Sequence, residues 1–82
     1  MPYIPQDQRV RAVFDPRDAG ELNFAITKLI TSYLQFKGTR YATFNDIIGA
    51  LEGAKLELYR RVVGPYETQK AIENGDVYGE RE

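Results

Sequence analysis

The sequence predicts an all-α fold, and three observations support that prediction. Two segments, about 19–37 and 44–63, place apolar residues at steps of three and four, which is the spacing of one face of an α-helix. No segment alternates apolar and polar residues over a length typical of a strand. Glycine, proline and asparagine stand between the periodic segments, where helices end. We therefore expect an antiparallel helical hairpin with a kinked helical extension at about 65–74.

The first helix, about 19–37, has a start signal and a stop signal. Asp18 followed by Glu21 three residues later resembles a capping box, although Asp15–Pro16 is a competing start signal. Gly38 stops the helix directly after Lys37, whose positive charge suits the C-terminal end of a helix. The apolar face comprises Leu22, Ala25, Ile26, Leu29, Ile30, Tyr33 and Phe36.

The second helix, about 44–63, follows a connector, GTRYAT, that is short enough to make the two helices antiparallel neighbours. Thr43 is the expected N-cap, with Asp46 at the third helical position. The apolar face comprises Phe44, Ile47, Leu51, Ala54, Leu58 and Val62, and on a regular helix it would continue through Pro65, Gln69 and Ile72.

Gly64 and Pro65 interrupt this second helix. Proline has no backbone N–H and its ring clashes with the preceding turn, so either a kink or a break is expected. Pro65 also suits the first position of a third helical segment, about 65–74, which would end at Asn74–Gly75.

Both ends of the chain are expected to be peripheral parts of a single domain, 1–82. Residues 1–15 form a lead whose short helix would fold back onto the hairpin through apolar side chains such as Val10 and Val13. Residues 76–82 belong to an acidic stretch and are expected to be a flexible tail.

Length and composition indicate how such a small fold is stabilised. A chain of 82 residues buries only about 60–65% of its unfolded surface, which leaves a thin core. The chain has no cysteine and no histidine, so disulfides and the usual zinc ligands are excluded. Oligomerisation is the remaining common means of stabilising a small fold.

Charge and hydropathy argue against two classes of partner. The net charge is −1 with mixed signs along the chain, so nucleic acid is not an expected partner. The N-terminus lacks the layout of a signal peptide, and no apolar run approaches the roughly 18 residues that a membrane span needs. We expect a soluble, cytoplasmic protein.

Two glycines on the second helix, Gly49 and Gly53, indicate a second packing surface. Together they cost the helix roughly 2 kcal/mol relative to alanine, and they lie with Leu56 and Arg60 opposite the apolar face. Phe24 of the first helix is likewise predicted to face outward. We expect these five residues to form a self-association interface, because glycines let another backbone approach closely. Alternatively, the glycines pack against the N-terminal segment of the same chain, or they are merely tolerated.

A cluster of arginines and tyrosines is a second candidate site, for a small phosphorylated ligand. Guanidinium groups bind phosphate, and aromatic rings stack on bases and on cations. The alternative is that the arginines pair with Glu57 on the helix surface. The candidate residues are Arg40, Tyr59, Arg60, Arg61 and Tyr66.

No catalytic, cofactor-binding or metal-binding constellation is recognisable. Glu52 and Glu57 lie about 140° apart around the helix, so they cannot converge on one metal ion. Without histidine or cysteine, no acid–base or nucleophile–base pair stands out. We expect neither an enzyme nor a cofactor.

Three strings in the sequence carry a resemblance: "GELNFAITKLI", then "YRRVVGPYE", then "NGDVY". The chain resembles a family of small proteins of unknown function met in bacterial and phage genomes, whose members share a GELN-aromatic-x-IT, YRR-x-x-x-PYE and NGDVY pattern. The resemblance covers about 20–78 and implies a cytoplasmic or phage-encoded protein, with no activity attached. It marks as the signature Gly20, Glu21, Leu22, Asn23, Tyr59, Arg60, Arg61, Pro65, Tyr66, Glu67, Asn74, Gly75, Asp76 and Tyr78.

An antiparallel hairpin brings the start of the first helix near the end of the second. We therefore expect Glu21 and Asn23 to meet Arg61 in a buried ion-pair network. The sequence as a whole predicts a non-enzymatic interaction protein whose partner is a second copy of itself or another protein. A protein that sequesters a small phosphorylated ligand is the alternative.

Overall fold

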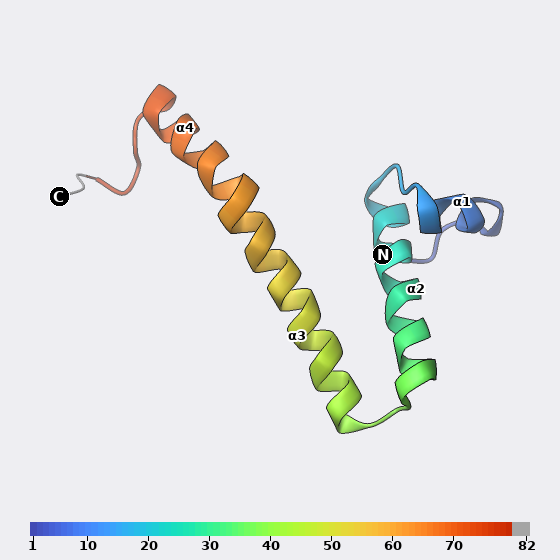
Figure 1. Cartoon of the computed structure of the whole chain (residues 1–82). Helices are drawn as coiled ribbons and strands as arrows, with labels where there is room; N and C mark the ends of the chain where they lie inside the picture. Colours follow the sequence, from blue (N-terminus) through green and yellow to red (C-terminus); the bar gives the residue numbers. More distant parts are fainter. Residues whose placement is uncertain (80–82) are drawn as a thin grey trace. The chain divides into compact units, whose positions relative to one another are not determined.

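The computed structural model describes residues 1–79, which contain helices and no strand, so the predicted all-α class is confirmed (Figure 1). The chain divides into two compact units, 1–47 and from residue 48 onward. The elements in chain order are the 3₁₀ turn Gln6–Gln8, α1 (Arg9–Phe14), α2 (Ala19–Lys37), α3 (Tyr41–Leu58), the π-helical turn Tyr59–Val63, and α4 (Gly64–Asn74). Part of the predicted flexible tail, 80–82, lies outside the described residues.

Helix α2 begins and ends where its sequence signals place it. The carboxylate of Asp18 accepts a hydrogen bond from the backbone N–H of Glu21 at 2.8 Å, which caps the first turn. Gly38 ends the helix with φ 94°, a left-handed conformation that favours glycine, and its N–H donates to the carbonyl of Leu34 at 2.7 Å. The predicted bounds of 19–37 are confirmed.

The N-terminal lead contains the predicted short helix and packs against α2, but Val10 and Val13, the predicted contacts, are 78% and 38% exposed. Ala12 of α1 is fully buried. At the start of α2, a Cβ added to Gly20 would lie 3.4 Å from Cγ2 of Ile4 and 3.6 Å from the carbonyl oxygen of Met1. The lead therefore packs against the start of α2 within the first unit.

Helix α3 begins three residues earlier than predicted. The carbonyl of Arg40 accepts the N–H of Phe44 at 3.0 Å, so the helix starts at Tyr41. Thr43, the predicted N-cap, lies inside the first turn and is only 1% exposed. The capping prediction was wrong because the backbone hydrogen bonds began upstream of the threonine.

The predicted interruption at Pro65 is a π-helical turn, through which the helix continues to Asn74. The N–H of Gly64 donates to the carbonyl of Tyr59, five residues back, instead of to the residue four back. A wider turn accommodates proline, which has no N–H to donate and whose ring crowds the preceding turn. Helix α4 then carries Pro65 in its first turn, as predicted, and ends at Gly75, whose φ is 97°.

The π-turn changes which residues share a face. A π-turn holds one extra residue, so every later side chain is turned back by about 100° relative to a regular α-helix. The predicted continuation of the apolar face through Pro65, Gln69 and Ile72 is therefore wrong. Beyond the π-turn, Thr68 and Ile72 come to the side of the glycines. The face that carries Ile47 and Leu51 continues through Tyr66, Lys70 and Glu73.

Burial is confined to the first unit. Among the described residues, the buried ones are Ala12, Glu21, Phe24 and Thr43. From residue 48 to residue 79 no residue is buried. Within the described part of the chain, every helix is too short or too polar to cross a membrane.

Candidate functional site

The predicted interface glycines lie on an open face of α3. A Cβ added to Gly49 or Gly53 would meet no atom within 4 Å. Leu56, on the same side of the helix, is 57% exposed. The N-terminal segment, the alternative partner of these glycines, has a packing site of its own beside Gly20. We call Gly49, Gly53, Leu56 and Arg60 the glycine face.

Phe24, the fifth predicted interface residue, does not face outward. It is 8% exposed, and the guanidinium of Arg9 lies 5.4 Å from the centre of its ring. Such a cation–π contact is stronger where water is excluded. The prediction was wrong because it treated α2 as a bare helix, whereas the N-terminal lead covers this flank.

Glu21 is the centre of a charged cluster that joins the lead to α2. The two guanidinium nitrogens of Arg11 donate to its two carboxylate oxygens at 2.9 and 2.6 Å, and the backbone N–H of Arg17 donates at 2.9 Å. Glu21 is 3% exposed, so this carboxylate is buried with its partners in place. The hydrogen bond from Arg11, and to a smaller extent the one from the backbone of Arg17, holds the pKa of Glu21 below its ordinary value. The hydrogen bond between Arg11 and Glu21 also raises the pKa of Arg11.

The predicted network of Glu21, Asn23 and Arg61 is replaced by shorter-range pairs. Asn23 accepts a hydrogen bond from the hydroxyl of Thr27 at 3.2 Å, and Arg61 donates to Glu57 at 3.5 Å. The lead supplies an arginine to Glu21 only ten residues upstream. Sequence reasoning had placed no contact there, although the basic string RVRAVFDPR precedes α2.

The arginines of the candidate anion site already have partners close in sequence. Arg60 and Arg61 both donate to Glu57, at 2.5 and 3.5 Å, and Arg40 donates to the carbonyl of Lys37 at 3.2 Å. Each arginine pair lies on the surface, with more than half of the side chains of Arg60, Arg61 and Glu57 exposed. This is the alternative that the sequence left open for these residues.

The tyrosines of the candidate anion site are also exposed. Tyr59 is 53% exposed and begins the π-turn, and Tyr66 is 62% exposed. The ammonium group of Lys70 lies 5.6 Å from the centre of the Tyr66 ring. The rings are thus accessible, while the charges beside them are satisfied by their own helix.

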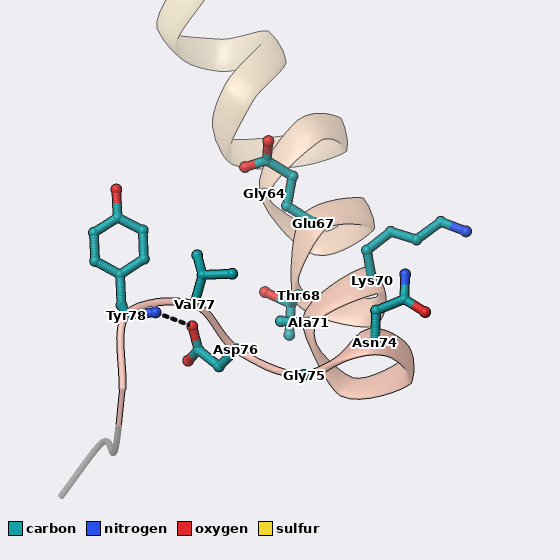
Figure 2. Close-up of a pocket in the computed structure, with 10 residues that line it drawn as sticks. All are labelled: Gly64, Glu67, Thr68, Lys70, Ala71, Asn74, Gly75, Asp76, Val77 and Tyr78. Atoms are coloured by element: carbon teal, nitrogen blue, oxygen red, sulfur yellow. Dashed lines mark hydrogen bonds between the residues drawn. The ribbon is translucent and has the colours of Figure 1, made fainter.

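A groove between α4 and the segment Gly75–Tyr78 was not predicted (Figure 2). The chain leaves α4 at Gly75, and the N–H of Tyr78 donates to the carboxylate of Asp76 at 2.9 Å, which fixes a tight turn. The groove has a volume of about 770 Å³ and stays open to solvent. Its lining includes Gly64, Glu67, Thr68, Ala71 and Asn74 of α4 together with Asp76, Val77 and Tyr78. The string NGDVY marked this turn in the sequence without indicating a cavity.

A hydrogen bond across the connector completes the first unit. The hydroxyl of Tyr33 donates to the carboxylate of Asp46 at 2.9 Å and so links α2 to the beginning of α3. Its bond to Asp46 raises the pKa of Tyr33 above the ordinary value. Among the described residues, no three carboxylates gather where they could hold a metal ion.

Comparisons with known proteins identify the family and add no activity. No curated protein and no solved structure matches the chain. A family model does match, over residues 1–77, and this range includes the N-terminal lead and all of the turn after α4 except Tyr78. The chain belongs to the family described as a domain of unknown function, DUF6899.

Proposed function

We propose that the chain is a non-enzymatic interaction protein that self-associates through the glycine face of α3. The observation that carries the proposal is that the second unit has no buried residue among those described. From residue 48 to residue 74 it is one continuous helical segment, in which no residue is buried. A single helix has no core of its own, and most helical stability in proteins comes from packing an apolar face.

The composition of this helix makes packing all the more necessary. Gly49 and Gly53 lower its intrinsic stability by roughly 2 kcal/mol relative to alanine. Both have open space above them, and Leu56 beside them is more than half exposed. A second helix that approaches closely at the glycines would bury Leu56 and offset this cost.

A second copy of the chain is the partner that the composition favours. The chain lacks cysteine and histidine, so it cannot use disulfides or zinc–histidine sites to stabilise so small a core. A homodimer presents the same surface twice, and the flat glycines of one copy can receive Leu56 of the other. Phe24 has no part in this interface, because it is buried beneath the lead.

Sedimentation equilibrium of the purified protein tests the proposal. We expect a dimer or higher oligomer, and we expect Gly53→Leu to shift the protein to monomer because leucine blocks close approach. Lys55→Leu is the matched control, since it adds the same side chain to α3 away from the glycine face. Circular dichroism of both variants shows whether the helices still form. A native protein that stays monomeric at high concentration overturns the proposal.

A further inference from the structure

We propose that Tyr41 of a second copy fills the groove between α4 and the segment Gly75–Tyr78 in an antiparallel two-fold dimer. The inference rests on the self-association proposed above. The inference adds the relative orientation of the two partner helices and the residue at which they cross. It also names the side chain that each copy contributes to the other.

The groove lies on the same side of the long helical segment as the glycine face. After correction for the extra residue of the π-turn, Thr68 lies in line with Gly49, and Ala71 lies within about 40° of Leu56 around the helix. Both Thr68 and Ala71 line the groove. A partner helix that contacts the glycine face therefore passes toward the groove.

The distribution of charge favours an antiparallel arrangement. Two parallel copies in register would set every charge against its own copy, and like charges across an interface are costly. In an antiparallel pair that crosses at Gly53, Asp46 is seven residues before the crossing and Arg60 is seven after it. The two charges are opposite in sign and face each other, each keeping the contact that it makes in its own chain, Asp46 with Tyr33 and Arg60 with Glu57.

The distances along the helix bring Tyr41 to the groove. Tyr41 lies twelve residues before Gly53, or about 18 Å along the axis. The groove residues Gly64 and Thr68 lie eleven and fifteen residues after Gly53, or about 17 and 23 Å in the opposite direction. A two-fold axis also sets each flank of a helix against the same flank of its partner. Tyr41 lies within about 60° of Leu56 around the helix, on the same flank as the groove residue Ala71.

The chemistry of the groove suits a tyrosine ring. Tyr41 is 82% exposed, so one subunit leaves most of its ring in water. The lining includes Gly64, which has no side chain, together with the small Ala71 and the apolar Val77. Glu67 and Asp76 also line the groove, and their carboxylates can accept a hydrogen bond from a phenol hydroxyl.

Disulfide trapping tests the arrangement directly, because the natural chain has no cysteine. Two single variants, Tyr41→Cys and Thr68→Cys, are prepared separately, mixed at a concentration at which each still sediments as a dimer, and oxidised. We expect a crosslinked species in the mixture and little in either variant alone. Each variant carries a single cysteine, so any disulfide can only join two copies.

The outcomes separate this inference from the proposed function. Crosslinking of Tyr41→Cys to itself indicates a parallel pair and overturns the inference. A dimer in sedimentation with no crosslink in the mixture overturns it too, while self-association stands. A monomeric native protein overturns both.

Tyr41→Phe and Tyr41→Ala provide a second measurement. We expect alanine to weaken dimerisation by about tenfold to hundredfold, as truncation of a buried aromatic anchor does, and phenylalanine to weaken it less.

Discussion

Arg11 and Glu21 are joined by two parallel hydrogen bonds that tie α1 to the first turn of α2. This bidentate geometry matches the planar guanidinium to the planar carboxylate. The Arg11–Glu21 pair forms where α1 packs against α2. Among the described residues of these two helices, Ala12 and Phe24 are the buried apolar ones. The pair therefore fixes the position of the lead.

Replacing Glu21 by Gln should destabilise the first unit strongly. The change leaves Arg11 facing an uncharged amide in a buried position, and the loss of one partner from a buried pair is costly. We expect thermal unfolding followed by circular dichroism to show a melting temperature lower by at least about 10 °C. Glu52→Gln is the control, because Glu52 pairs with Lys55 on an exposed surface. Equal effects of the two changes would show that the Glu21 pair adds no special stability.

The same pair should make stability depend on acid. The folded-state pKa of Glu21 lies below the ordinary value of 4.5, so its contribution is present above that pH and is lost as the pH falls through the lowered pKa. We expect the melting temperature to fall below about pH 4.5, and Glu21→Gln to show a shallower fall than the native protein. Parallel curves for the two proteins would contradict this assignment.

Tyr33 should titrate above the ordinary pKa of a tyrosine. Its hydroxyl donates to Asp46, so loss of the phenol proton would set two negative charges together, and the pKa is raised. The stability from this bond is present below the ordinary pKa of 10.0 and is lost as the pH rises through the raised value. Absorbance of tyrosinate in alkali should show a late component that Tyr33→Phe removes. A native curve identical to that of the variant would refute the prediction.

Gly64→Ala should destabilise the helix although alanine is the better helix former. A Cβ at residue 64 would lie 3.0 Å from the carbonyl oxygen of Tyr59, which is tighter than about nine in ten real Cβ contacts. The carbonyl of Tyr59 is backbone and must shift by a few tenths of an ångström to make room, and we expect the cost of that shift to exceed the roughly 1 kcal/mol that alanine gains over glycine in a helix. Gln35→Ala, at an exposed site of α2, is the control and should be neutral or slightly stabilising. Increased helicity in Gly64→Ala would mean that the π-turn relaxes to an α-helix at no cost.

Phosphate and nucleotides should leave the melting temperature unchanged. The guanidinium groups of Arg60 and Arg61 are already paired with Glu57, so an anion must compete with a carboxylate of the same helix. A ligand at 100 times its dissociation constant would add about 2.7 kcal/mol to the free energy of unfolding, which thermal-shift screening detects readily. A stabilising nucleotide whose effect Arg60→Ala abolishes would support the sequestering function instead.

The sequence by itself determined the helical class and the ends of the helices that depend on local chemistry. Asp18, Gly38 and Gly75 act through backbone groups within one turn, so their effects are readable from neighbouring residues. Pro65 likewise predicted an irregular turn, because the missing N–H is a property of that residue alone.

Tertiary structure decided the partners of Glu21 and Phe24 and the faces of α4. Arg11 and Arg9 reach these side chains only because α1 folds back onto α2. The spacing of residues within α2 could not predict a contact with another helix. The π-turn added one residue to the helix and rotated α4, which a wheel of constant 100° steps cannot represent. Local signals follow from each residue's own backbone chemistry, whereas burial and pairing depend on which distant segment lies alongside.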